Sequence, residues 1–204
     1  MRGLVLDNQK SRGIAAHIID PVARGLLRMG VKPNHVTVVT ALAVSIIVLM
    51  TWSQGYFLLG MALVLPFTIG DLLDGTMARL SGSTSALGGF LDSVLDRVTD
   101  AALVGSLLWW SISTSQDPLV IFTGIVAIAT GGIVPYIRAK AEALNVECKV
   151  GIMERGERAL VVGIAVIVAG FGFLAAIEIA FIILAFFNSV TVIQRIAVVA
   201  KALR

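Results

Sequence analysis

Four aspartates lie in a short stretch of an otherwise apolar sequence, DLLDGTMARLSGSTSALGGFLDSVLD (residues 71–96). The chain of 204 residues is 57% hydrophobic and 14% charged. On helices, Asp71 and Asp74 (i, i+3) share one face, and so do Asp92 and Asp96 (i, i+4). A short polar connection at 80–85 separates the two pairs. We therefore expect two adjacent antiparallel helices whose carboxylates converge.

Carboxylates inside a membrane helix need compensation, because each isolated aspartate costs about 2.5–3.5 kcal/mol on insertion scales. A hydrated cavity or a bound cation supplies it. Carboxylate oxygens without a histidine or cysteine partner are hard ligands, suited to Mg²⁺ or Mn²⁺ and not to zinc. Four of them predict a site for two divalent ions, the arrangement that clamps the attacking and leaving oxygens in phosphoryl-type transfer.

Small residues accompany these aspartates at helical spacing: Gly75, Ala78 and Gly88. Small residues also serve tight helix packing in membranes. Because these three residues are at helical spacing from the aspartates, we favour the interpretation that they leave room for a bulky anionic ligand near the metals. Arg79 follows directly and is placed to bind a phosphate that the metals do not neutralise.

The apolar segments predict an all-α integral membrane protein with one domain over residues 1–204. A spanning helix needs about 20 apolar residues, and six segments qualify: 34–53, 57–80, 86–112, 118–141, 156–173 and 177–199. With both termini inside, all sixteen Lys and Arg fall on or near the cytoplasmic side, as the positive-inside rule requires. We expect the cell membrane as location, with no cleavable signal peptide.

The N-terminal segment 1–32 is expected to lie on the cytoplasmic side, before the membrane core 33–204. Residues 8–29 are too polar to span, and their apolar stripe among basic residues favours an amphipathic helix in the membrane interface. A poorly ordered basic arm is the alternative.

The aspartate stretch resembles a known family signature. It reads Asp-x-x-Asp-Gly-x-x-Ala-Arg, then eight residues, then Gly-x-x-x-Asp-x-x-x-Asp. This is similar to the complete signature of the CDP-alcohol phosphotransferase family, with every fixed position filled. The six predicted spans and the leading interfacial helix fit that family over the whole chain.

Members of that family transfer a phosphatidyl-type group from a CDP-linked lipid to an alcohol and release CMP. The resemblance implies that the four aspartates hold two divalent cations, and that Asp96 is also the general base for the acceptor hydroxyl. It implies a homodimer as well, and no nucleic-acid partner is expected. Asp100, one turn beyond the signature, is either a further metal ligand or, as we favour, a residue that supports the metal ligands or forms an ion pair.

The resemblance also assigns residues to the CDP-lipid: Asp74, Gly75, Ala78, Arg79 and Gly88. The stretch KPNHVT (32–37) resembles the family's Pro-Asn-x-x-Thr motif. That likeness implies three further contacts near the nucleotide: Pro33, Asn34 and Thr37. A proline-initiated helix start explains this shorter motif almost as well.

Cations cluster at the predicted inner ends of the last three spans: Arg138, Lys140, Arg155, Arg158 and Arg195. Positive-inside placement explains most of them equally well. Arg195 is the exception, because it lies in an apolar run, FNSVTVIQRIAVV, with no acidic neighbour. Several cations near a metal site suit an acceptor that already carries a phosphate.

The stretches PYIRAKAEA (135–143) and ERGERALVV (154–162) resemble the actinobacterial phosphatidylinositol phosphate synthases of that family. On this resemblance the donor is CDP-diacylglycerol, in the membrane lipid, and the acceptor is inositol 1-phosphate. The implied phosphate ligands are Arg138, Lys140, Arg155 and Arg195.

Three alternatives remain open. The first is another member of the same family, whose acceptor is glycerol 3-phosphate or another alcohol. Membrane prenyltransferases also bind Mg²⁺-diphosphates with aspartates, but on well-separated helices and with more spans. A cation transporter explains the aspartates, but neither Arg79 nor the glycine spacing.

Overall fold

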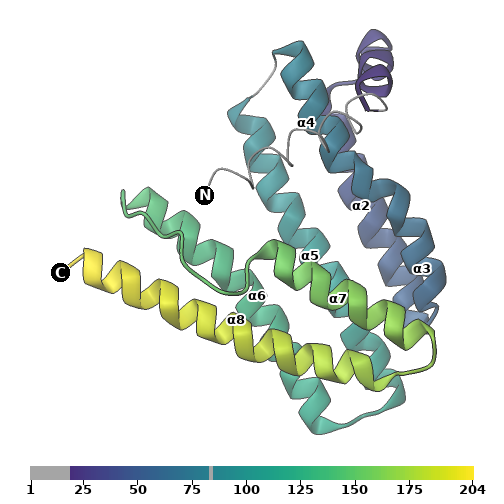
Figure 1. The fold of residues 1–204 in the computed structure, drawn as a ribbon, viewed down its shortest axis with the longest axis vertical. Coiled ribbons are helices and arrows are strands. Elements are labelled where there is room, and N and C mark those ends of the chain that lie inside the picture. Colours follow the sequence, from purple (N-terminus) through teal and green to yellow (C-terminus); the bar gives the residue numbers. More distant parts are fainter. Residues whose placement is uncertain (1–18, 83–84) are drawn as a thin grey trace, which may run out of the picture. The chain divides into compact units, whose positions relative to one another are not determined.

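The computed structural model describes residues 19–82 and 85–204, and every element in these ranges is a helix (Figure 1). Residues 8–18 of the predicted interfacial helix lie outside the described residues. After a helical segment at 19–28, the elements are α2 (Pro33–Thr51), η1 (Trp52–Gln54), α3 (Phe57–Val64), η2 (Leu65–Ile69), α4 (Gly70–Ser81), α5 (Ala86–Thr114), α6 (Pro118–Ala143), α7 (Arg155–Gly170) and α8 (Ala175–Ala202).

Helices occupy all six ranges predicted to span, which confirms the all-helical prediction for the described residues. By length and composition, α5 and α7 do not qualify as membrane-spanning helices. The helix α7 has 16 residues, and α5 carries aspartates and an arginine in its first half. Six spans therefore stay a prediction. Among the described residues, four segments are long and apolar enough to cross a membrane: Pro33–Gln54, Phe57–Ser81, Pro118–Ala143 and Ala175–Ala202.

The chain forms two compact units. Of the described residues, the first unit contains 19–44, 64–82 and 85–96, and the second contains 45–63 and 97–204. All four signature aspartates belong to the first unit. The four predicted acceptor-phosphate ligands belong to the second.

In the second unit, α8 lies alongside both α6 and α7 (Figure 1). Phe181 and Leu184 on α8 are buried. A Cβ at Gly124 would lie 2.7 Å from Leu108 Cδ1 and 3.4 Å from Phe181 Cε2. Glycine at this position therefore lets α6 approach its neighbours closely, a common device in membrane helices.

Large apolar side chains cover much of the outer surface of the long helices. A water-exposed surface of this kind is unfavourable, but a lipid-facing one is not. It therefore agrees with helices that cross a bilayer. Examples are Val39, Met50, Phe122, Phe186 and Ile193.

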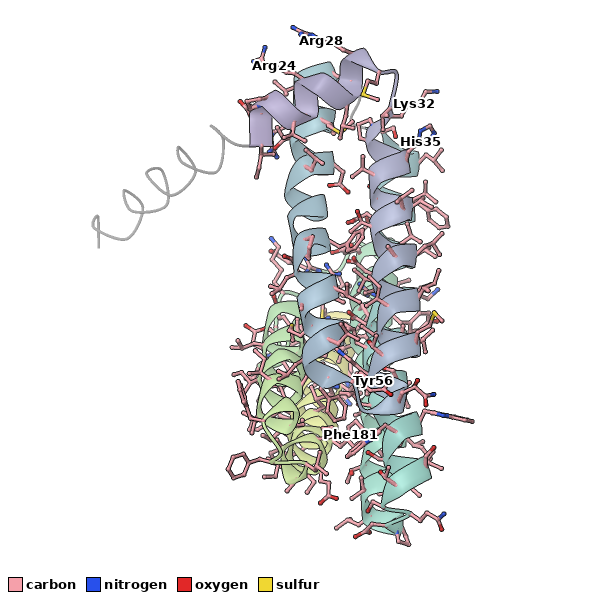
Figure 2. All side chains as sticks on the ribbon, turned by 90° about the vertical axis from the view of Figure 1, so that its right-hand side faces the viewer. Arg24, Arg28, Lys32, His35, Tyr56 and Phe181 are labelled. Carbon is pink, nitrogen blue, oxygen red and sulfur yellow. The ribbon has the colours of Figure 1, made fainter. Side chains whose placement is uncertain are left out.

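The helical segment 19–28 lies across the N-terminal end of α2 (Figure 2). Ile19 and Ala23 are buried, whereas Arg24 and Arg28 are exposed and project outward in Figure 2. One apolar face and one basic face are typical of a helix at a membrane surface. This division supports the interfacial position, which stays a prediction.

Candidate functional site

The signature aspartates lie on two helices that follow one another in the chain. Asp71 and Asp74 belong to α4, and Asp92 and Asp96 belong to α5. The side chains of Asp74 and Asp96 are half-buried and that of Asp92 is exposed, while that of Asp71 lies outside what the structure describes. No cluster of three or more His, Cys, Asp or Glu forms among the described side chains. Convergence of all four carboxylates therefore stays a prediction.

Asp74 is held from α2. Thr37 Oγ1 donates a hydrogen bond to Asp74 Oδ2 at 2.5 Å. The carbonyl oxygen of Pro33 lies 3.3 Å from the same hydroxyl. A hydroxyl has only one proton, and the shorter distance and negative charge favour the carboxylate. Thr37, predicted as a nucleotide contact, thus also fixes the orientation of a predicted metal ligand.

The contact between α2 and α4 continues one turn away. A Cβ at Gly70 would lie 2.5 Å from Thr40 Oγ1. Thr40 follows Thr37 by three residues on α2, and Gly70 precedes Asp74 by four on α4. Both pairs therefore belong to one helix–helix face. The absent side chain at Gly70 lets α2 come close enough for Thr37 to reach Asp74.

The start of α5 meets the start of α2 at Gly88. A Cβ there would lie 3.0 Å from Asn34 Oδ1 and 3.3 Å from Ser85 Oγ. Ser85 Oγ accepts a hydrogen bond from Gly88 N at 3.0 Å, as an N-cap residue does. Gly88 and Asn34, both assigned to the CDP-lipid from the sequence, are thus neighbours. Gly88 leaves the space that Asn34 occupies.

A pocket of about 470 Å³ opens beside these residues. Its size is within the range of small-molecule sites, about 300–1,000 Å³. Its backbone and side chains offer several polar groups, which suits a polar ligand. The lining residues include Lys32, Pro33, Asn34, Ser81 and Ser85.

Arg79 lies at the end of α4, exposed to solvent. Its Nη2 donates to Thr76 Oγ1 at 2.8 Å, one turn earlier. A Cβ at Gly75 would lie 3.5 Å from Arg79 Nη1, an ordinary contact. Packing among the described residues therefore does not require glycine at position 75. This favours ligand access over helix packing as the reason for Gly75; Ala78 nearby is half-buried.

Asp100 forms ion pairs with two arginines of α7. Arg158 Nη2 donates to Asp100 Oδ2 at 2.8 Å, and Arg155 Nε lies 3.7 Å from Asp100 Oδ1. This confirms the ion-pair interpretation that the sequence left open. Sequence reasoning did not identify the partners, since Arg158 is 58 residues away and no local pattern connects them.

Two further predicted phosphate ligands, Arg138 and Lys140, lie on α6. Arg138 Nε lies 3.1 Å from Glu142 Oε1, one turn along the same helix. Lys140 is exposed near the end of α6. Exposed pairs of this kind contribute little to stability. Binding of an anion by Arg138 therefore competes only with a weak contact.

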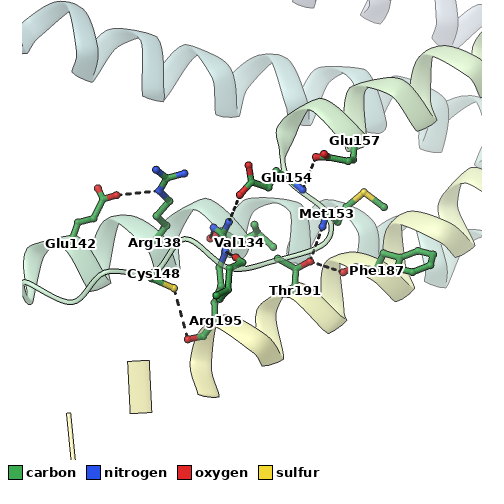
Figure 3. A network of polar contacts seen from close by, with 11 residues as sticks. Val134, Arg138, Glu142, Cys148, Met153, Glu154, Glu157, Phe187, Thr191 and Arg195 are labelled. Atoms are coloured by element: carbon green, nitrogen blue, oxygen red, sulfur yellow. Dashed lines mark hydrogen bonds and ion pairs between the residues drawn. The ribbon is translucent and has the colours of Figure 1, made fainter. Parts of the chain in front are cut away.

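Arg195 is almost fully buried, with 3% of its side chain exposed. Its Nε donates to the carbonyl oxygen of Val150 at 2.8 Å, and its Nη1 donates to that of Val134 at 2.7 Å (Figure 3). Glu154 Oε1 lies 3.7 Å from its Nη2. Arg195 thus joins α6, α8 and the segment before α7. Its predicted role as a phosphate ligand stays a prediction.

The same segment is fastened at a second point (Figure 3). Thr191 Oγ1 accepts a hydrogen bond from Met153 N at 3.1 Å and donates to the carbonyl oxygen of Phe187 at 2.9 Å. Gly151 has a φ of +133°, and a Cβ there would lie 2.5 Å from Thr191 Cγ2. Only glycine combines that backbone conformation with so close an approach.

The donor set of the first unit fits a hard divalent cation. Asp74, Asp92 and Asp96 offer only carboxylate oxygens, which Mg²⁺ and Mn²⁺ prefer. Asp74 has in addition an outer hydrogen-bond donor in Thr37, the kind of partner that orients metal-binding carboxylates.

Comparison with known proteins agrees with this site. Residues 31–198 match the CDP-alcohol phosphatidyltransferase family. A phosphatidylinositol phosphate synthase of Mycobacterium marinum is 35% identical over 189 residues, covering 91% of this chain and 81% of the relative. One of Streptomyces avermitilis is 33% identical over 209 residues, covering 98% and 84%.

Solved structures of the Mycobacterium tuberculosis phosphatidylinositol phosphate synthase share the fold. The structure with CDP-DAG bound has a TM-score of 0.85 at 33% identity and covers 90% of this chain and 94% of its own. The structure in complex with manganese and citrate has a TM-score of 0.84 at 33% identity, covering 89% and 88%. The chain therefore belongs to the CDP-alcohol phosphatidyltransferase family.

Proposed function

We propose that this protein transfers the phosphatidyl group of CDP-diacylglycerol to inositol 1-phosphate, giving phosphatidylinositol phosphate and CMP. The observation that carries the proposal is the complete signature on α4 and α5, in a chain matching relatives named for this product over 91% of its length. The CDP-DAG complex of one relative supports the donor.

Asp71, Asp74, Asp92 and Asp96 would hold two divalent cations, with Mg²⁺ as the preferred metal and Mn²⁺ as a substitute. The manganese complex of a relative supports divalent binding. Bound cations neutralise charge on the diphosphate and stabilise the leaving phosphate. Thr37 holds Asp74 in place for this role.

Asp96 acts as the general base. It takes the proton of the acceptor hydroxyl while that oxygen forms a bond to the lipid-linked phosphorus. The bond between this phosphorus and the bridging oxygen of the diphosphate breaks. CMP leaves with that electron pair.

The polar groups around the pocket at the start of α2 bind the nucleotide end of the donor. Pro33 and Asn34 line that pocket, and Gly88 makes room for Asn34. Arg79 pairs with phosphate oxygens, and Gly75 and Ala78 leave space for them. Arg138, Lys140, Arg155 and Arg195 bind the phosphate of the acceptor.

The membrane arrangement belongs to the proposal as well. We expect six spans in the cell membrane, both termini and the active site on the cytoplasmic side, and a homodimer. The basic face of residues 19–28 supports a cytoplasmic interfacial position, because anionic headgroups attract Lys and Arg there.

The test is a donor–acceptor assay. Purified protein is incubated with CDP-diacylglycerol, Mg²⁺ and one labelled alcohol at a time, with Asp96→Asn as the inactive control. We expect CMP release and a labelled lipid with inositol 1-phosphate. Turnover with glycerol 3-phosphate alone would contradict the proposed acceptor. Cation flux in donor-free liposomes, without CMP release in the assay, would favour the transporter alternative.

A further inference from the structure

One carboxylate of α5 serves two arginines of α7. Asp100 Oδ2 accepts a hydrogen bond from Arg158 Nη2 at 2.8 Å, and Asp100 Oδ1 lies 3.7 Å from Arg155 Nε. Because each arginine has its own oxygen, both contacts exist together. The family signature ends at Asp96, so the proposed metal site does not account for Asp100.

The three side chains form a graded series in burial. Arg158 is 10% exposed, Asp100 25% and Arg155 43%. A buried guanidinium requires its partner, so Arg158 fixes the position of the Asp100 carboxylate. Asp100 then presents its second oxygen to the more exposed Arg155. The buried Arg158 thus fixes Asp100, and Asp100 in turn restricts the orientation of the more exposed Arg155.

Asp100, Arg155 and Arg158 together carry one more positive than negative charge. Two guanidinium groups share one carboxylate, and Arg97 lines the same cavity as Asp100 and Arg158. Both α7 arginines also lie in the first turns of their helix, where the helix dipole favours anions over cations. The helix dipole therefore does not explain these two arginines, and their positive charge suits a nearby anion.

We propose that Asp100 is a positioning residue for the phosphate of the acceptor. It holds Arg155 at Nε, so that the Nη groups of that arginine meet the phosphate oxygens in a fixed orientation, and Arg158 is the anchor. Two-point recognition of phosphate by arginine depends on such orientation. The inference rests on the proposed function, in which Arg155 is a phosphate ligand.

The competing role for Asp100 is that of an additional metal ligand. Asp100 lies one helical turn after Asp96, so its position in the sequence permits this role. Both of its oxygens, however, face guanidinium groups. A carboxylate engaged in this way is poorly placed to coordinate a cation.

The experiment compares the full-length wild type with Asp100→Asn, Asp100→Glu and Glu147→Gln. Glu147 is the matched control, because it is an exposed carboxylate whose pKa is lowered by its hydrogen bond to Lys149. KM is measured for inositol 1-phosphate and for CDP-diacylglycerol, together with the Mg²⁺ concentration for half-maximal activity. Binding of inositol 1-phosphate without donor is measured by calorimetry.

For Asp100→Asn we expect the acceptor KM to rise about two- to fivefold, the effect of losing one partly exposed ion pair at 3.7 Å. Acceptor binding should weaken in parallel, while the donor KM and the Mg²⁺ requirement stay unchanged. Asp100→Glu should recover part of the loss, and Glu147→Gln should behave as wild type. An unchanged acceptor KM, or a shifted Mg²⁺ requirement in its place, would overturn the positioning role.

A second variant separates positioning from folding. Asp100→Asn combined with Arg158→Gln removes both members of the buried pair, so that Arg158 is not left as a buried charge without its carboxylate. The acceptor KM should remain raised in this double variant, because Arg155 still lacks its contact with Asp100; recovery of the wild-type KM would overturn the inference. Turnover of the wild type with each alcohol tests the proposed acceptor independently of the variants. The ratio of the acceptor KM of each variant to that of the wild type is then measured with whichever phosphorylated acceptor the wild type uses.

Discussion

The hydrogen bond from Thr37 to Asp74 allows a direct test of the metal site. Thr37→Val removes the hydroxyl but keeps the branched shape of the side chain. Asp74 then loses the donor that lies 2.5 Å from its Oδ2. The packing of α2 on α4 at Gly70 is unaffected, because Thr40 makes that contact.

The expected loss of Mg²⁺ affinity follows from the negative charge of the Asp74 carboxylate, which accepts the hydrogen bond. A hydrogen bond to an ionised group contributes about 1.5–3 kcal/mol, and Asp74 is half-buried, so the lower part of this range applies. Loss of an outer partner of a metal-binding carboxylate typically lowers metal affinity by about 10–100-fold. We therefore expect the Mg²⁺ concentration for half-maximal activity to rise about tenfold, with turnover largely restored at saturating Mg²⁺.

The assay is CMP release at fixed donor and acceptor concentrations while Mg²⁺ is varied. Thr37→Ser keeps the hydroxyl and should retain most of the wild-type Mg²⁺ affinity. Thr40→Val is the matched control, because it makes the same change one turn along the same face of α2. It should leave the Mg²⁺ requirement unchanged.

Two results would refute this reasoning. If Thr37→Val raised the KM for CDP-diacylglycerol and left the Mg²⁺ requirement unchanged, Thr37 would be a nucleotide contact only. If Thr40→Val shifted the Mg²⁺ requirement as much as Thr37→Val does, the effect would come from helix packing and not from the hydrogen bond.

Three further changes have defined outcomes. Asp96→Asn should lower turnover by about 10²–10⁴-fold, because it removes the base, while CDP-lipid binding, measured by calorimetry at saturating Mg²⁺, is largely retained through the three remaining aspartates. Gly88→Ala puts a Cβ 3.0 Å from Asn34 Oδ1 and should raise the donor KM severalfold, whereas Gly89→Ala, with open space around its Cβ, should not. Gly151→Ala is strained at a φ of +133° and should cost about 1–3 kcal/mol, seen as a lower Tm in a thermal melt.

The course of the second predicted span shows what local sequence can and cannot determine. The sequence predicts one span over 57–80, and Pro66 lies within it. The structure has α3, then the 3₁₀ segment Leu65–Ile69 with that proline near its start, then α4. Proline lacks the N–H of the regular ladder, so the sequence locates the interruption. How the chain rejoins the next helix depends on packing, including the contact of Gly70 with Thr40.

The charged residues of the last helices required the tertiary structure. The position of Arg195 as a lone cation in an apolar run indicates only that its guanidinium needs hydrogen-bond acceptors. Carbonyl oxygens of Val134 and Val150 meet that need as well as a phosphate does, and both come from elsewhere in the chain. Asp100 shows the converse: its helical spacing relates it to Asp96, but its partners lie on α7. Spacing identifies residues that share a face, whereas only the fold determines which charges meet across it.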